Sequence, residues 1–473
     1  LKRRDFLKSA GILTGALLTV GIGYRQIYKI RGRNFQPGLA EETLRSIVPS
    51  PDPGSLPNII LILVDDFGYG DLDALSAETP NLHRMAADGV RLNSFYASAS
   101  VCSPSRAGIM TGRYPVRTLV TTPFFSTHDA MNEVLNVFGR YSYNVRGIPK
   151  DEVLLPEILR RRGYRTGLVG KWHLGGTKGH LPNERGFDYF YGALWSNDDP
   201  PYAIYRDSDV VVPAPADQDR LTYDLTTEAV DFIRQNQGGP FFLYLAHVMP
   251  HEPIHASDRY RGTSESGIYG DTVRELDWSV GQILETLNQL DLDRNTLVIF
   301  SSDNGPWWQG NPGYSRGRKL HFFEGSYRVP FLARWPGVIP PGTIQEGISM
   351  NFDLFVTFLN LAGVPIPQDR IIDGADMLPL LKGERATVHE TLFFYSTRTL
   401  AAVRYGPWKY YRRMTTDNAA YWPLKQGPFL FHLDRDPNES YNLVDSQPDL
   451  AAELSSMLIA FENNMQENLR GWQ

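Results

Sequence analysis

The chain has 473 residues, of which 42% are hydrophobic and 21% are charged, and its formal net charge at pH 7 is −6. This length exceeds one small domain, so we expect a large domain and a smaller one, each with its own packed core. The acidic balance argues against nucleic acid as a partner, because no basic surplus exists to neutralise phosphates. A single cysteine rules out internal disulfide bonds.

The first residues combine a basic start with a short apolar stretch. Residues 2–8 read Lys-Arg-Arg-Asp-Phe-Leu-Lys, and an apolar stretch of about 14 residues, short for a membrane span, follows to Gly23. This pattern resembles a twin-arginine export signal. We therefore expect residues 1–24 to be a signal segment that uses the twin-arginine export machinery and directs the chain to the periplasm or the cell surface. No clear Ala-x-Ala site follows, so both cleavage and retention as a membrane tether stay open, and an ordinary buried helix is the alternative.

Residues 25–56 are rich in proline and are predicted to be a linker. The next residues, 58–64, form a continuous apolar run that ends in Asp65-Asp66, as is typical of a strand covered on both faces of a parallel sheet. Similar runs occupy residues 166–170, 240–246, 296–302 and 329–334. Helical periodicity occupies residues 79–88, 154–162 and 271–290.

This alternation predicts an α/β fold over residues 57–385, with a large central, mostly parallel sheet flanked by helices. Ligands bind beyond the carboxyl ends of the strands in such sheets, where residues far apart in the chain converge. From residue 386 to 473 the segments become short and hairpin-like, and the last of them is followed by a helical pattern over 449–468. We expect this part to be a small antiparallel α+β subdomain.

Two pairs of oxygen-bearing residues follow predicted strands. Asp65 and Asp66 come directly after the first strand, and Asp303 and Asn304 come after the run 296–302. Carboxylate and amide oxygens without thiolate or imidazole select a hard divalent cation, calcium or magnesium, over zinc or copper. The sequence therefore predicts a metal site made by these four residues, although adjacent aspartates taken alone are more often a turn.

The only cysteine, Cys102, begins the run Cys-Ser-Pro-Ser-Arg-Ala-Gly-Ile-Met-Thr-Gly-Arg. Ser103 is predicted to cap a helix that starts at Pro104 and is ended by Gly112, which aims the helix N-terminus at residue 102. The N–H donors and positive dipole of this terminus suit a bound sulfate, and the guanidinium of Arg106 lies one turn further on. The alternative is an inert buried cysteine before a helix.

Other polar residues follow the predicted strands singly. Lys171 and His173 lie in Gly-Lys-Trp-His-Leu-Gly, His251 lies in Pro-His-Glu-Pro, and Lys319 precedes Glu-Gly by five residues. Ser196 lies in Trp-Ser-Asn-Asp. A lysine and a histidine after a strand are, taken alone, more often surface residues, whereas the His251 and Lys319 motifs are each a moderate signal of a site. The nearby pair 307–308, Trp-Trp, either lines a sugar or aryl pocket or packs in the core or rim.

Residues 251–255 also fit the His-Glu-x-x-His pattern of zinc proteases. That chemistry requires both histidines on one face of a continuous helix. Pro250 and Pro253 interrupt the segment, so we reject this interpretation.

Taken in order, these motifs resemble the type I, formylglycine-dependent sulfatases, which are arylsulfatase-like members of the alkaline phosphatase superfamily. The resemblance covers residues 57–445 and includes Asp-Pro-Asn-Glu at 436–439. Three features depart from the family pattern: Gly108, Ser326, and about 25 inserted residues between Thr121 and Arg146. The insertion leaves substrate choice open.

The resemblance implies that a maturation enzyme oxidises Cys102 to formylglycine, whose hydrate attacks sulfur. It also implies a calcium cofactor, with magnesium as the alternative, at the four predicted ligands. The implied catalytic residues are Cys102, Arg106, Lys171, His173, His251 and Lys319. The implied substrate contacts are Lys171, His251, Lys319 and Ser196.

The expected function is therefore hydrolysis of aryl or carbohydrate sulfate monoesters to an alcohol and inorganic sulfate. His251 or Lys319 would protonate the leaving alcohol, and His173 would be the base for the second hydroxyl of the hydrate. Two alternatives remain open: a phosphate or phosphonate monoester hydrolase on the same scaffold, and a catalytically silent tethered binding protein.

Overall fold

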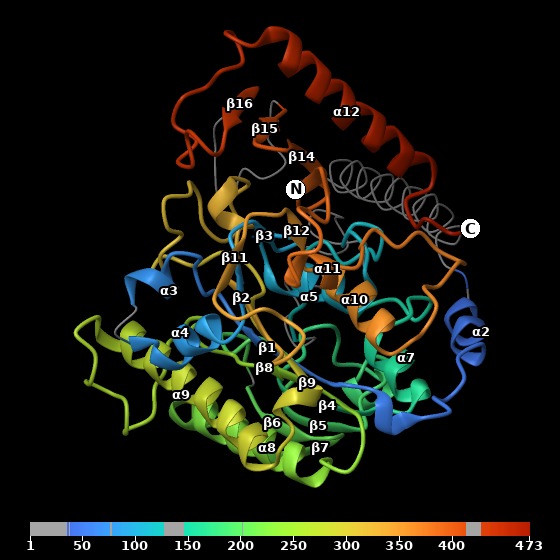
Figure 1. Cartoon of the computed structure of the whole chain (residues 1–473), viewed down its shortest axis with the longest axis vertical. Helices are drawn as coiled ribbons and strands as arrows, with labels where there is room; N and C mark the ends of the chain where they lie inside the picture. Colours follow the sequence, from blue (N-terminus) through green and yellow to red (C-terminus); the bar gives the residue numbers. More distant parts are fainter. Residues whose placement is uncertain (1–35, 37, 76–77, 127–145, 201, 413–426) are drawn as a thin grey trace, which may run out of the picture.

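The centre of the molecule is a ten-stranded sheet (Figure 1). The computed structural model describes residues 36, 38–75, 78–126, 146–200, 202–412 and 427–473, so the predicted signal segment and most of the predicted insertion lie outside the described residues. The strand order is β11-β2-β10-β9-β1-β8-β4-β5-β6-β7. Five central neighbours run parallel: β9 (Thr296–Ser302), β1 (Asn58–Val64), β8 (Phe241–Ala246), β4 (Arg165–Lys171) and β5 (Tyr189–Ala193).

The outer strands mix both directions. On one side of the parallel core, β10 (Phe331–Arg334) is antiparallel to β9 and to β2 (Val90–Leu92), and β11 (Thr343–Gln345) is parallel to β2. On the other side, β6 (Ile204–Arg206) and β7 (Asp209–Val212) add in antiparallel order. The sheet is therefore mixed but mostly parallel at its centre, as predicted.

Alternate residues of β1 point into two different cores, which explains its continuous apolar sequence. Ile59, Leu61 and Leu63 pack with α5 (Cys102–Thr111), α7 (Leu155–Arg162) and α10 (Asp353–Leu361). The residues between them pack with α4 (Pro80–Ala87), α8 (Leu221–Gln235) and α9 (Gly267–Gln289) on the opposite face. Figure 1 shows α8 and α9 lying together on this second face.

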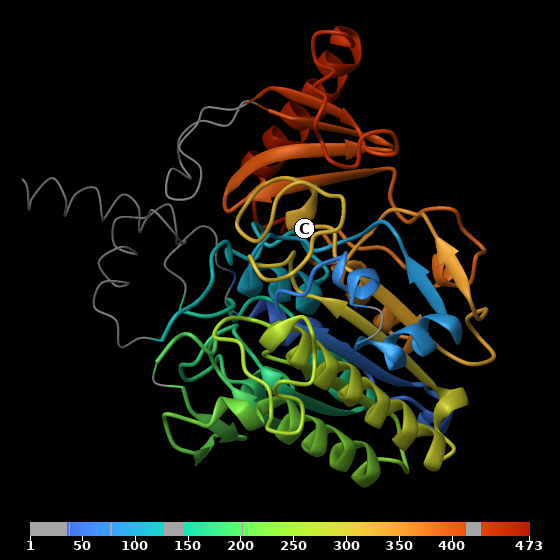
Figure 2. The same cartoon turned by 90° about the vertical axis from the view of Figure 1, so that its left-hand side faces the viewer.

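The C-terminal part forms a second unit (Figure 2), and its hydrophobic cluster also includes residues of the first unit such as Tyr96, Tyr114 and Phe352. Its antiparallel sheet has the order β13 (Thr391–Ser396), β14 (Thr399–Tyr405), β15 (Trp408–Tyr411) and β16 (Phe429–His432). Helix α12 (Pro448–Glu467) packs against β14 and β15. This confirms the predicted antiparallel α+β unit with a terminal helix.

The remaining elements are short. They are α2 (Leu39–Arg45), α3 (Asp71–Ala74), α11 (Leu378–Leu381), the strand pair β3 (Phe95–Tyr96) and β12 (Ser349–Met350), and 3-10 turns at Pro53–Ser55, Pro182–Arg185, Gln218–Arg220, Asp293–Asn295 and Glu324–Ser326. Helix α2 lies inside the segment predicted to be a linker. None of the helices in the described part of the chain combines the length and hydropathy that a membrane span requires.

Candidate active site

The predicted site residues lie at the carboxyl ends of neighbouring parallel strands. In the sheet register Val64 of β1 is opposite Ser302 of β9, so the residues that follow, Asp65 and Asp303, emerge side by side. Lys171, the last residue of β4, reaches the same edge and contacts Asp65 although the two are 106 positions apart in the chain. Strand order thus brings distant residues to one point, as expected for an open α/β sheet.

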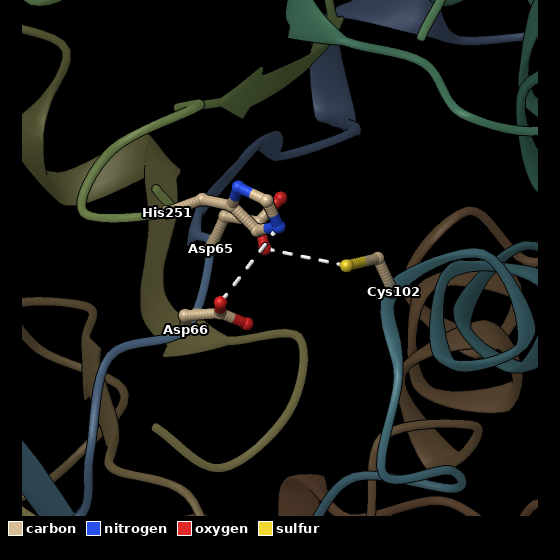
Figure 3. A group of neighbouring side chains, drawn as sticks. All are labelled: Asp65, Asp66, Cys102 and His251. Atoms are coloured by element: carbon tan, nitrogen blue, oxygen red, sulfur yellow. Dashed lines mark hydrogen bonds and ion pairs between the residues drawn. The ribbon is translucent and has the colours of Figure 1, made fainter. Parts of the chain in front are cut away.

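Cys102 faces this edge from the first turn of α5. Its side chain is only 2% exposed, and Sγ lies 3.4 Å from Oδ1 of Asp65 (Figure 3). The helix begins at Cys102 with Val101 as its N-cap, so the prediction of a Ser103 cap before Pro104 was wrong. The Ser103 hydroxyl instead accepts a hydrogen bond from the backbone N–H of Phe124 at 3.1 Å. The predicted end was right, because Gly112 terminates the helix in the left-handed conformation with φ 70°.

Cys102 is not set up as a thiolate. Burial and then the charge of Asp65 raise the pKa of the Cys102 thiol far above its usual range. A protonated thiol is a poor nucleophile and a poor metal ligand. Cys102 as an unmodified thiol is therefore suited neither to attack a substrate nor to bind a metal ion.

Two cations neutralise Asp65. Oδ2 of Asp65 lies 2.6 Å from Nζ of Lys171 and 3.1 Å from Nη2 of Arg106. Arg106 also binds Oδ2 of Asp303 at 2.9 Å and donates to the carbonyl oxygen of Lys171 at 2.8 Å. All of these groups are buried. Burial opposes the charge of Asp65, but Lys171, His251 and the other cations together hold its pKa well below its usual range.

A third cation, Lys319, neutralises Asp66. Nζ of Lys319 lies 2.9 Å from the Asp66 carboxylate, and Nδ2 of Asn304 donates to Oδ1 of Asp66 at 2.7 Å. Burial raises the pKa of Asp66 to about 6 against the opposing effect of Lys319. Burial and the nearby Asp65 likewise raise the pKa of Asp303 to about 6. Crowded carboxylates of this kind are stabilised in ionised form by bound cations.

His173 is held with one ring nitrogen free. Its Nε2 lies 2.7 Å from the carbonyl oxygen of Phe124, so this nitrogen carries the proton and donates. Nδ1 is buried and has no hydrogen-bond partner among the described residues. Burial, together with Lys171, holds the pKa of His173 well below its usual range. His173 also has φ 59°, the uncommon left-handed region, which the surrounding structure must enforce. The result is a neutral imidazole with an available lone pair.

His251 faces the centre from the loop after β8. Its Nδ1 lies 2.5 Å from the carbonyl oxygen of Glu252, and its Nε2 lies 3.8 Å from Oδ2 of Asp66 (Figure 3). Burial and Lys319 lower the pKa of His251 to about 4. The second histidine of the rejected zinc-protease pattern, His255, instead pairs with Asp219 at 2.7 Å, and no helix spans the segment. The two histidines therefore have different partners, which confirms the rejection.

Ser196 completes the ring of polar groups around Lys171. Its hydroxyl oxygen accepts a hydrogen bond from Nζ of Lys171 at 3.0 Å. The hydroxyl proton of Ser196 thus remains available for another acceptor. The next residue, Asn197, donates to the carbonyl oxygens of His251 at 3.4 Å and Pro253 at 3.0 Å, which ties this loop to the His251 loop.

The oxygen ligands predicted for a metal fit the structure in part. Donor atoms of Asp65, Asp66, Cys102 and His251 lie within 4.8 Å of one another (Figure 3). This set shares Asp65 and Asp66 with the prediction. Oδ1 of Asn304 is buried without a hydrogen-bond partner in the described part of the chain. A buried polar oxygen is costly without a partner, so this atom fits a cation ligand.

All the predicted site residues meet at one edge of the sheet, and the structure adds two that the sequence did not single out. The hydroxyl of Tyr244 lies 3.4 Å from Nη1 of Arg106, and the backbone of Phe124 orients His173 and Ser103. A tyrosine in the middle of an otherwise apolar buried strand was an available signal for the first. No sequence signal could have indicated Phe124, because it acts through its backbone and not through its side chain.

Comparisons with known proteins cover both units of the chain. Residues 57–364 match the family model described as Sulfatase, and residues 314–464 match the model described as N-sulphoglucosamine sulphohydrolase, C-terminal. N-acetylgalactosamine-6-sulfatase of Canis lupus familiaris is 38% identical over 447 residues, which are 83% of this chain and 82% of that protein. Arylsulfatase A of Bos taurus is 38% identical over 450 residues, 84% of this chain and 85% of that protein. A solved structure from work on the metabolism of multiple glycosaminoglycans by Bacteroides thetaiotaomicron has a TM-score of 0.77 at 28% identity, covering 86% of this chain and 100% of that one.

Proposed function

Since the chain belongs to the sulfatase family and is an arylsulfatase-like hydrolase, we propose that it hydrolyses aryl or carbohydrate sulfate monoesters at the Cys102 centre. The observation that carries this proposal is the position of Cys102. It lies at the N-terminus of a buried helix, 3.4 Å from Asp65, where three carboxylates meet three cations. Once oxidised to formylglycine, residue 102 would supply an aldehyde hydrate as the nucleophile.

We propose that Asp65, Asp66, Asp303 and Asn304 hold a calcium or magnesium ion, which would withdraw charge from the sulfuryl oxygens. The unpartnered Oδ1 of Asn304 supports this assignment. Cys102 and His251 lie close to the same carboxylates, but a protonated thiol does not suit a hard cation. The negative charges of the three carboxylates already balance the positive charges of Arg106, Lys171 and Lys319. A bound divalent cation would therefore give the cluster a net positive charge, which suits an anionic ester.

The sulfuryl oxygens have two further sets of donors. Nζ of Lys171 has three N–H groups and uses two of them on Asp65 and Ser196, and among the described residues the third has no side-chain partner, so we propose that it binds substrate. The Ser196 hydroxyl accepts from Lys171 and keeps its own proton for the same purpose. Lys319, on the other side of Asp66, supplies a second ammonium group. These donors are fixed before substrate arrives, so they stabilise charge in the transition state without reorganisation.

Two proton transfers follow from the ring orientations. Nδ1 of His173 holds a free lone pair and takes the proton from the remaining hydroxyl of the nucleophile. Nε2 of His251 faces the centre because Nδ1 is held by the Glu252 carbonyl. Lys319 protonates the departing alcohol. His251 is the alternative, and it would first have to take up a proton at Nε2, because its Nδ1 donates to the Glu252 carbonyl and burial lowers its pKa to about 4. Arg106 lies one helical turn after Cys102 and donates hydrogen bonds to Asp65 and Asp303. We propose that it also orients the hydrate.

Maturation must precede folding if Cys102 is the modified residue. Its side chain is 2% exposed, so a modifying enzyme cannot reach it in the folded chain. The twin-arginine-type pattern at residues 2–8 is typical of proteins exported in folded form. We therefore propose that a formylglycine-generating enzyme acts on the chain before folding, and that the folded protein is then exported to the periplasm or cell surface.

Matched substrates test the proposal. We expect the purified protein to release nitrophenol from 4-nitrophenyl sulfate much faster than from 4-nitrophenyl phosphate, and peptide mass spectrometry to find an aldehyde at residue 102. Faster turnover of the phosphate would establish the phosphate or phosphonate hydrolase instead. An unmodified Cys102 together with no turnover of either ester would establish the silent binding protein. Cys102→Ala is the control, and it should abolish hydrolysis while leaving the urea unfolding midpoint nearly unchanged.

A further inference from the structure

A loop of thirteen residues, 306–318, borders the active site at both of its ends; we call it the rim loop. It begins two residues after Asn304 and ends directly before Lys319. The backbone N–H of Lys319 donates to the carbonyl oxygen of Pro306 at 2.9 Å, which closes the base of the loop. The rim loop is therefore anchored at both ends beside residues of the active site.

The backbone of the rim loop is held by partly buried hydrogen bonds. Nη1 of Arg318 donates to the carbonyl oxygens of Trp307 at 2.7 Å and Gly310 at 2.5 Å. On the outer side, the backbone N–H of Asn311 donates to Oδ1 of the buried Asp71 at 2.9 Å, and Gly70 donates back to the carbonyl oxygen of Asn311 at 2.9 Å. These bonds clamp the rim loop against the loop that follows Asp65 and Asp66.

Trp308 is presented to solvent by this fixed backbone. Its side chain is 62% exposed, whereas the neighbouring Trp307 is half-buried and meets its ring edge-on at 6.1 Å. The guanidinium of Arg318 lies 5.7 Å from the centre of the Trp308 ring, and the ring of His321 approaches at 6.3 Å. Single exposed apolar residues are common. A large exposed indole on a loop whose backbone is anchored beside the active site is a different case, because it offers an apolar face at low entropic cost.

The groups next to Trp308 are polar. Nε2 of Gln309 donates to Oε1 of Glu252, which joins the rim loop to the loop that carries His251. Both side chains are at least partly exposed, so they can form hydrogen bonds with a bound group. An aryl leaving group has no hydroxyl groups, so the pair would stay bonded to each other and to water and would contribute nothing to its binding. A sugar ring offers both surfaces, since its C–H face is apolar and its edge carries hydroxyl groups.

Building on the proposed sulfatase activity, we propose that Trp308, with Glu252 and Gln309, forms a leaving-group subsite for the sugar ring of a sulfated carbohydrate. Trp308 stacks on the C–H face of the ring. The side chains of Glu252 and Gln309 form hydrogen bonds with the hydroxyl groups of the ring. Trp308 is thus a specificity-determining residue: it lowers the barrier for sugar sulfates and contributes little for small aryl sulfates.

The test compares substrates within each variant. The sugar probes are galactose 6-sulfate, glucose 6-sulfate, N-acetylgalactosamine 6-sulfate and chondroitin sulfate, and the aryl probe is 4-nitrophenyl sulfate. We expect Trp308→Ala to lower kcat/KM on the sugar probes by roughly tenfold or more and to change kcat/KM on the aryl probe by less than about twofold. Trp308→Phe keeps an aromatic face and should recover most of the loss. Gln309→Ala should lower the same sugar activities by roughly threefold or more.

The outcomes separate the subsite from the activity on which it rests. Equal losses on both kinds of substrate would show that Trp308 supports the loop alone and would overturn the subsite. Unchanged kinetics of Trp308→Ala on every probe would also overturn the subsite. A wild-type protein that hydrolyses the aryl probe but none of the sugar sulfates would overturn it as well. A wild-type protein with a modified residue 102 that hydrolyses neither kind would overturn the proposed function itself.

Discussion

Glu439 is a buried glutamate through which the C-terminal unit contacts the segment that follows Lys319. Its Oε2 accepts a hydrogen bond from the backbone N–H of Glu324 at 2.9 Å, and the hydroxyl of Tyr411 donates to its Oε1. The carboxylate of Glu324 pairs with Nζ of Lys409 at 2.5 Å. Burial raises the pKa of Glu439 to about 7, with Lys409 opposing and Glu324 adding to the rise. We predict that Glu439→Gln removes a pH-dependent loss of stability.

The size of the effect follows from the two protonation equilibria. The carboxyl group changes its pKa from 4.5 in the unfolded chain to about 7 in the folded one, so the folded state binds the proton more tightly. Its stabilising contribution is fully present below pH 4.5 and is lost as the pH rises through 7. Between pH 5 and pH 8 the loss is about 2 to 3 kcal/mol. Glutamine stays neutral and can replace the protonated acid, because its amide oxygen accepts from Glu324 and its NH₂ donates to Tyr411.

Urea denaturation at pH 5 and pH 8 measures this difference. We expect the free energy of unfolding of Glu439→Gln, relative to the wild type, to increase by about 2 to 3 kcal/mol between the two pH values. Comparing variant with wild type cancels the other groups that titrate in this range. Glu453→Gln, on an exposed face of α12, controls for the loss of one carboxylate. A variant whose relative stability is the same at both pH values would refute the reasoning.

Three further predictions concern the centre itself. Cys102→Ser should fold normally and release at most one equivalent of nitrophenol per site, because serine lacks the second hydroxyl of an aldehyde hydrate; steady turnover in a stopped-flow trace would contradict this. Asn304→Ala removes the unpartnered buried oxygen and should weaken calcium affinity by roughly tenfold or more in isothermal titration, and an unchanged affinity would exclude Asn304 as a ligand. Arg106→Ala removes the ion-pair partner of the buried Asp303, leaves Asp65 paired with Lys171, and should cost about 3 to 5 kcal/mol of unfolding free energy in urea; a loss below about 1 kcal/mol would show that the Arg106 ion pairs are not needed.

Local patterns placed the central elements well. The apolar runs at 58–64 and 296–302 form β1 and β9 with the predicted bounds, because strands covered on both faces are apolar along most of their length. Helix α8 was not predicted, since its buried face includes Thr222 and Thr226, which disguise the periodicity. The hydroxyl of Thr226 is satisfied inside the helix pair by the Thr222 carbonyl and the Ser279 hydroxyl. The start of α5 was misplaced because Ser103 bonds to Phe124, a partner that local sequence cannot indicate.

The sequence by itself determined which chemical groups are present and at which strand ends they emerge, because strand period and motif order are local properties. It thus predicted the family, the nucleophile precursor and the oxygen ligands. Only the tertiary structure decided how these groups pair: Lys171 and Arg106 with Asp65, Lys319 with Asp66, and Oδ1 of Asn304 with no described residue. It also decided that Trp308 stands exposed on a clamped loop. Such pairings depend on strand order and on contacts between residues far apart in the chain, and these arise only when the whole sheet has assembled.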